Sequence, residues 1–167
     1  NSKGTKLTDA ELVLTHFTGT WAQARRIMKK KILDLKKIGF ELNLDLLSRM
    51  MVVTLTKSAL FKKNSKLKYE NYSEEDYKTA WMKISKALDY LVPILQQDGL
   101  ISSTNDLNTN NVLVPIVFYL VNNDNKFTGK FRSAITCFAL RFGCAFTHFC
   151  CNEFSNFGGF FDEPVSN

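Results

Sequence analysis

Prolines, glycines and long apolar runs are scarce in this sequence, and each scarcity excludes a class of protein. Three prolines and eight glycines among 167 residues exclude collagen-like and linker-like material. No run of 18 or more residues is free of charged and polar side chains, so no transmembrane helix is expected. Hydrophobic residues at 45% and charged residues at 23% exclude a fully disordered chain and are typical of a globular protein.

The first residues lack the basic and then apolar order of a secretory signal peptide. Because the chain begins at Asn1 and not at a methionine, we interpret it as an internal fragment or a processed product. We expect a cytoplasmic location and no membrane partner.

Residues for catalysis are also scarce. The two histidines, His16 and His148, have no paired carboxylates nearby, and a histidine beside an aromatic such as Phe17 is usually structural. The patterns of a phosphate-binding loop, of a zinc protease helix and of a serine hydrolase elbow are all absent. We therefore predict no catalytic residue and no metal ligand, and the sequence leaves open whether the chain belongs to an enzyme.

All four cysteines lie between residues 137 and 151, where phenylalanine is also concentrated. Their spacing around His148 matches no common zinc site, and disulfides would require an oxidising compartment that nothing else indicates. Buried free thiols in an aromatic-rich helix are the favoured interpretation, and a truncated or out-of-frame ending of the gene is another. The predicted organisation is a helical domain over residues 1–129 and a Phe/Cys-rich helix with a poorly ordered tail over residues 130–167.

Apolar periodicity predicts an all-α fold, an irregular bundle of about five to seven helices. Thr8 and Glu11 form a capping box before the first helix, which Gly19 is expected to break. Asn43 is expected to cap a third helix, and Asn110 or Asn111 a later one. Pro93 is expected to kink its helix or end it a turn early. The expected helices after the first are 21–38, 44–55, 73–99 and 112–121.

One of these helices carries an apolar stripe that predicts the core. Trp81 and Leu88 lie seven residues apart on one face, with Ile84 and Leu91 beside them. We therefore predict that both are core residues and not ligand contacts.

Positive charge is concentrated in the first half of the sequence. Residues 1–70 carry 15 lysines and arginines against 6 acidic residues, whereas residues 71–167 carry 7 against 10. Arg25, Arg26, Lys29 and Lys30 are the candidate DNA-binding residues, because such a cluster can neutralise phosphates. The alternative is a solvated helix face without a ligand. A second basic cluster consists of Lys57, Lys62, Lys63, Lys66 and Lys68.

A short polar turn precedes the first helix and is a weaker candidate site. Backbone N–H groups around Gly4, together with Lys3, could contact a phosphate. An ordinary loop leading into a helix explains the same residues.

Two stretches resemble the GmrSD-type restriction endonuclease family, in the helical region that follows its ParB-like core. The opening NSKGTKLTDAEL resembles the segment of the family in which an asparagine, a basic or polar pair and a glycine precede a helix start. The later stretch resembles a helix, a Gly-[IL]-x-Ser loop and an Asn-capped apolar helix. The resemblance covers residues 1–125, and its matching positions are Asn1, Lys3, Gly4, Leu7, Thr8, Glu11, Leu12, Trp21, Trp81, Ala87, Leu88, Gly99, Leu100, Ser102, Asn110, Asn111, Pro115 and Tyr119.

The resemblance implies a parent protein that targets DNA with nucleotide hydrolysis, in restriction or phage defence. It implies a nucleoside triphosphate and a divalent metal in that parent, with Asn1, Lys3 and Gly4 at one edge of a nucleotide pocket. The family's Asp-Gly-Gln-Gln-Arg motif and its His-Asn-His module are absent, so the chain itself is expected to hydrolyse no nucleotide. DNA and the N-terminal core of the parent are the expected partners. The alternatives are a non-catalytic helical interaction or DNA-binding module and a decayed gene product.

Overall fold

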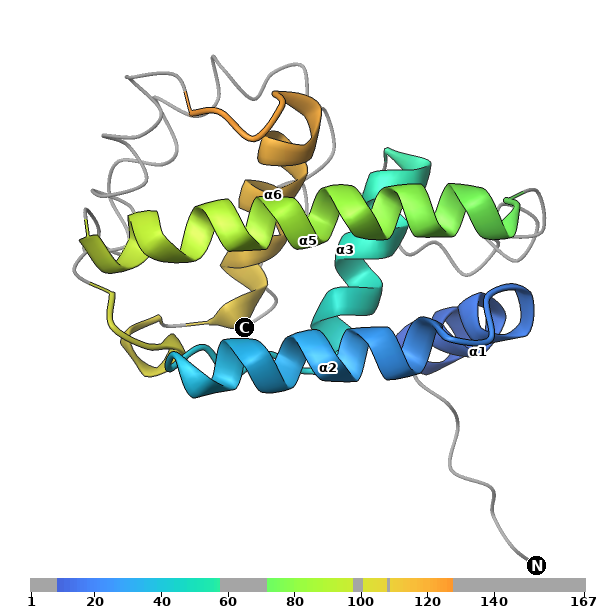
Figure 1. Ribbon diagram of the computed structural model, residues 1–167, viewed down its shortest axis with the longest axis horizontal. Coiled ribbons are helices and arrows are strands. Elements are labelled where there is room, and N and C mark those ends of the chain that lie inside the picture. The colour runs from blue at the N-terminus through green and yellow to red at the C-terminus, as the bar shows by residue number, and fades with distance from the viewer. Residues whose placement is uncertain (1–8, 58–71, 98–100, 108, 128–167) are drawn as a thin grey trace, which may run out of the picture.

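The computed structural model describes residues 9–57, 72–97, 101–107 and 109–127 (Figure 1). Across these ranges helices are the only regular secondary structure and no strand occurs, which confirms the all-α prediction. The described residues form five α-helices and two short 3-10 helices, in chain order: α1 Asp9–Thr20, α2 Ala24–Lys37, α3 Leu44–Thr56, α5 Glu74–Gln97, η1 Thr104–Asp106, η2 Asn110–Val112 and α6 Leu113–Asn122.

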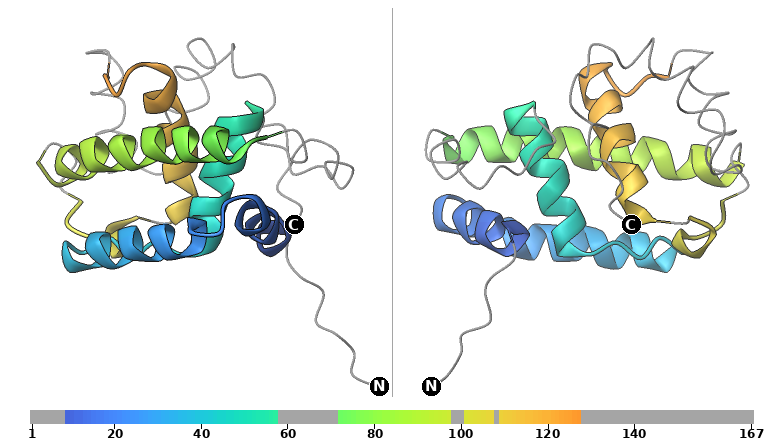
Figure 2. Two further views of the ribbon diagram at one scale, coloured as in Figure 1. Left: turned by 45° about the vertical axis from the view of Figure 1, so that its right-hand side comes forward. Right: turned by 180° about the vertical axis from the view of Figure 1, so that it is seen from behind.

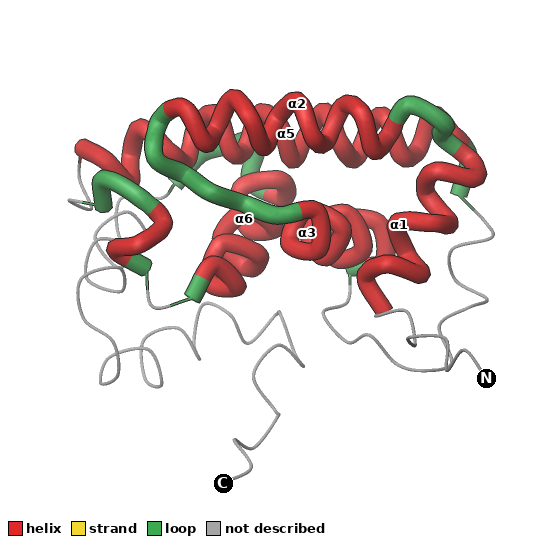
Figure 3. The backbone as a smooth tube through the Cα atoms, turned by 90° about the horizontal axis from the view of Figure 1, so that it is seen from below, coloured by secondary structure: helices red, strands yellow, loops and turns green. Residues whose placement is uncertain are grey.

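The helices form two crossed layers. α2 and α5 run alongside each other in the same direction, and α3 and α6 cross behind them (Figures 1 and 3). Two contacts set the alignment of the first layer: Lys31 Nζ pairs with Asp89 Oδ1 at 2.5 Å, and Gln96 Nε2 donates to the Ile38 carbonyl at 3.2 Å. Both contacts join residues 58 positions apart, as expected for parallel helices in constant register. α1 packs against α2 and α3 at one end, as the turned views show (Figure 2).

The core lies where α3 and α6 cross α5. α3 and α6 are apolar on several sides, so each can contact α5 and the other crossing helix at once. On α5 the predicted stripe is buried: Trp81 is 7% exposed and Leu88 1% exposed, which confirms both as core residues. Burying one such large apolar side chain contributes about 1.5–3 kcal/mol, and this burial stabilises the crossing.

The connection from α2 to α3 is tied to the loop after α5. Gly39 has a φ of +91°, and its carbonyl accepts a hydrogen bond from the Thr104 N–H at 3.1 Å. The Thr104 hydroxyl in turn accepts from the Glu41 N–H at 3.1 Å, and Asn110 Nδ2 donates to the Glu41 carbonyl at 3.3 Å. A glycine is required here for its positive φ and because a Cβ would lie 2.8 Å from the Ser102 carbonyl oxygen. α2 ends at Lys37 with Ile38 as its C-cap, which agrees with the predicted bound at residue 38 to within one residue.

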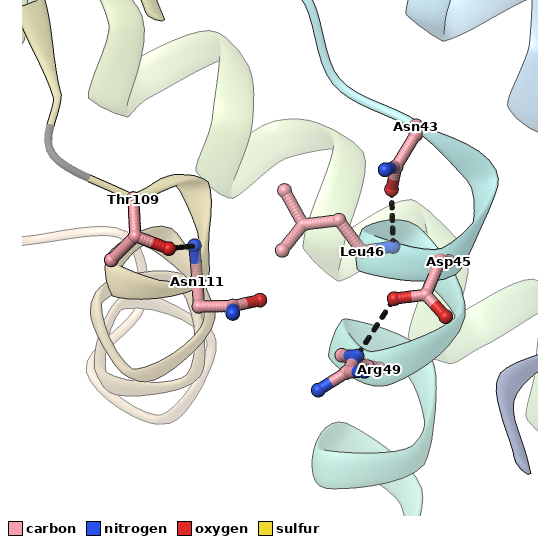
Figure 4. A network of polar contacts seen from close by, with 6 residues as sticks. All are labelled: Asn43, Asp45, Leu46, Arg49, Thr109 and Asn111. Atoms are coloured by element: carbon pink, nitrogen blue, oxygen red, sulfur yellow. Dashed lines mark hydrogen bonds and ion pairs between the residues drawn. The ribbon is translucent and has the colours of Figure 1, made fainter.

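The beginnings of α3 and of η2 lie near each other (Figure 4). Asn43 Oδ1 accepts from the Leu46 N–H at 2.8 Å, which confirms the predicted cap of α3. At η2 the cap is Thr109, whose hydroxyl accepts from the Asn111 N–H at 3.3 Å. The prediction of Asn110 or Asn111 as the cap was wrong, because a 3-10 turn precedes α6 and moves the helical start toward the N-terminus.

α1 and α2 differ from their predicted bounds at the corner that joins them. α1 continues through Gly19 to Thr20, so the glycine does not break it. Trp21 is buried and its carbonyl accepts from the Ala24 N–H at 3.0 Å, which makes a turn of residues 21–23. α2 therefore begins at Ala24, later than the periodicity predicts.

α5 extends beyond Pro93 to Gln97, so the proline does not end it early. Pro93 and Asp89, the residue one turn before it, both lie on the exposed side of α5. The carbonyl that loses its helical partner at a proline can there bond to water, and the helix continues. Gly99, expected to close this helix, and the predicted Phe/Cys-rich segment 130–167 lie outside the described residues.

Candidate nucleic-acid interface

α2 presents a cationic face to solvent. Its buried residues, Ala24, Met28 and Leu35, lie on one strip, because successive residues advance by about 100° around the helix. All four predicted DNA-binding residues are exposed on the opposite side: Arg25, Arg26, Lys29 and Lys30. The structure thus brings together the residues that the sequence singled out. In Figure 1 α2 follows the lower edge of the molecule, and no described helix lies below it.

The free cations of α2 lie toward its N-terminal end. Lys36 pairs with Glu41 at 3.1 Å and Lys37 pairs with Asp34 at 2.9 Å, both near the C-terminal end and well exposed. Arg26 only donates to Gln23 Oε1, at 3.2 Å. Within the described ranges, the other predicted DNA-binding residues, Arg25, Lys29 and Lys30, have no polar partner.

Lys31 differs from its two neighbours in the lysine run. Its side chain is only 14% exposed and pairs with Asp89 of α5. In this run Lys29 and Lys30 are therefore exposed to solvent, whereas Lys31 joins α2 to α5. Sequence alone could not separate them, because the partner is 58 residues away.

The first turn of α2 lacks the groups that usually stabilise a helix start. The Gln23 side chain makes no capping hydrogen bond, and no acidic residue lies in the first turn. Arg25 and Arg26 occupy that turn instead, where the positive end of the helix dipole disfavours cations. An anion placed there would relieve both unfavourable effects. The signal for this feature, two arginines after an uncapped start, was present in the sequence and was missed.

Asp34 lies on α2 close to several lysines of this cationic face. The hydrogen bond from Lys37 and its positive charge lower the pKa of Asp34, and the charges of Lys30 and Lys31 act in the same direction. Its carboxylate is the acidic group of α2 itself, and it lies beside Lys37, away from the first turn.

The predicted nucleotide-binding residues, Asn1, Lys3 and Gly4, lie outside the described residues. So do His148, the four cysteines and most of the second basic cluster, of which Lys57 alone is described, as the exposed C-cap of α3. His16 lies half-buried on α1.

The comparisons with known proteins identify no relative. No family model, no curated protein and no solved structure matches the chain. In the described part of the chain, no three potential metal-binding side chains come together. No helix there combines the length and the apolar character needed to cross a membrane.

Proposed function

We propose that this helical domain is a non-catalytic DNA-binding module that uses the outer face of α2 to hold the phosphate backbone. The observation that carries the proposal is the group of exposed cations Arg25, Arg26, Lys29 and Lys30 on one side of an uncapped helix start. Helix N-termini and unpaired cations each favour phosphate, and here they coincide.

The resemblance to the GmrSD-type restriction endonucleases suggests where such a module acts. In a cytoplasmic, nucleotide-dependent restriction or defence protein, this domain holds DNA while other parts of the parent bind the nucleotide and cleave. The role assigned to the domain requires no catalytic group of its own.

The test compares two quadruple variants with equal charge changes. The first replaces Arg25, Arg26, Lys29 and Lys30 with alanine. The control replaces four exposed lysines on other elements, Lys78, Lys83, Lys86 and Lys126. Affinity for a fluorescent DNA is measured by anisotropy over a range of salt concentrations.

Each phosphate contact contributes about −0.9 to the slope of log affinity against log salt on duplex DNA. The α2 variant should therefore flatten the slope by up to about 3.6, whereas the control should change it little. Equal effects of the two variants would show that net charge, and not the α2 face, determines binding.

A further inference from the structure

The six exposed cations of α2 form two parallel rows. Arg25, Lys29 and Lys36 lie along one side of the exposed face, and Arg26, Lys30 and Lys37 lie along the other. Within each row the residues are spaced i, i+4 and i+11, which keeps them at nearly one angle around the helix. The rows are about 100° apart, so they flank the middle of the exposed face of the helix.

Leu33 occupies the crest between the two rows. Its angle around α2 falls between those of the rows, and it is 59% exposed. It carries no hydrogen-bonding group, so it offers an apolar contact between two lines of positive charge.

Two lines of cations that flank one exposed helix face match two lines of phosphates on either side of a groove. A helix with its side chains is about 10–12 Å across, and the major groove of B-form DNA is about 12 Å wide. The cations from Arg25 to Lys37 extend over about 18 Å of helix at 1.5 Å per residue. The major groove of A-form RNA is too narrow and deep to admit a helix.

The described surface does not suit a single strand. Proteins that bind single strands stack bases on exposed aromatic rings. The large apolar side chains exposed in the described part of the chain are Leu33, Ile38 and Met82, none of them aromatic.

Building on the proposed function, we propose that α2 lies lengthwise in the major groove of B-form duplex DNA. One row faces each strand, with its phosphate contacts made by the cations that have no acidic partner, Arg25 and Lys29 in one row and Arg26 and Lys30 in the other. Leu33 faces the floor of the groove. Because the crest offers no donor or acceptor to the bases, this contact selects the shape of the duplex and not its sequence.

The first experiment compares three probes of one sequence at equal phosphate concentration: a 20-base-pair DNA duplex, the corresponding RNA duplex and the single DNA strand. The full chain should bind the DNA duplex at least about tenfold more tightly than the other two. Anionic phospholipid vesicles serve as a fourth probe, because a membrane surface also carries phosphate.

The second experiment places a negative charge on the crest. Leu33→Glu should weaken binding to the DNA duplex by at least about tenfold, because the carboxylate would enter the groove. Ile38→Glu is the matched control: an exposed apolar residue at the end of the same helix, beside Lys37 but off the crest. It should change affinity by less than about threefold.

The outcomes separate this inference from the proposed function. Equal binding to the three nucleic acids, with binding still lost in the quadruple α2 variant, would overturn the groove geometry and keep the proposed function. Equal effects of Leu33→Glu and Ile38→Glu on DNA affinity would likewise overturn the groove geometry and keep the proposed function. Binding to vesicles without binding to any nucleic acid would overturn both.

Discussion

Reversing the charge at the start of α2 should stabilise the protein and at the same time weaken its binding to DNA. The double variant Arg25→Glu/Arg26→Glu replaces two cations at the positive end of the helix dipole with two anions. Selection for stability alone would disfavour a cation at the start of α2, because the helix dipole is positive there. The opposite signs of the two effects make the prediction specific.

The expected gain follows from the position of the two residues. One favourable charge at an exposed helix end contributes about 0.3–1 kcal/mol, and each reversal also removes an unfavourable charge. Because both side chains are exposed and screened, we expect a total of about 1–2 kcal/mol at low salt. For a chain of this size that corresponds to a rise of about 2–8 °C in the unfolding midpoint. The loss of the Arg26–Gln23 hydrogen bond, which is exposed, subtracts little.

The assay is thermal unfolding followed by circular dichroism, together with DNA anisotropy on the same preparations. The slope of log affinity against log salt should become less steep by about 1.8, from the loss of two phosphate contacts. Lys83→Glu/Lys86→Glu is the control, with the same charge change in the middle of α5. It should give no comparable gain in stability, since the dipole acts only within the terminal turns.

Two results would refute this reasoning. An unchanged or lower midpoint in the α2 variant would mean that the first turn of α2 is already compensated. Unchanged DNA affinity would mean that Arg25 and Arg26 do not contact phosphate.

Three further predictions concern stability. Trp81→Ala should lower the free energy of unfolding by about 3–5 kcal/mol, because the indole is buried in the core stripe of α5. Denaturant unfolding measures this loss. Unchanged stability with lost DNA binding would mean that Trp81 serves a site. Gly39→Ala should destabilise the fold by about 1–3 kcal/mol or more, because φ is +91° and the new Cβ would lie 2.8 Å from the Ser102 carbonyl oxygen. A thermal unfolding midpoint equal to that of the native chain would contradict this close approach. Hydrogen bonds from the Ser73 hydroxyl and N–H lower the pKa of Asp76, so its carboxylate stabilises the fold above the unfolded pKa, near 3.8, and this stabilisation is lost as pH falls through the folded pKa. Asp76→Asn should therefore lower the unfolding midpoint at pH 7 but not near pH 2. A difference in midpoint that does not depend on pH would contradict this role of Asp76.

The sequence determined the features that depend on neighbours a few residues apart. The apolar stripe of α5, the cap at Asn43 and the end of α2 near residue 38 were predictable, because each rests on helical spacing or on one residue's local preference. The exposure of Arg25, Arg26, Lys29 and Lys30 was predictable for the same reason, since they lie opposite the apolar positions of α2.

Only the tertiary structure decided the features that depend on distant partners. Lys29, Lys30 and Lys31 have the same side chain, and the position of Asp89 on α5 decides that Lys31 pairs with α5 and does not join the cationic face. Pro93 is tolerated because the packing of α5 turns that side of the helix to solvent. The loop at Gly39 is held by the Thr104 N–H, because residues far apart in the chain meet there. Local spacing cannot specify such pairings, since they depend on how whole helices dock.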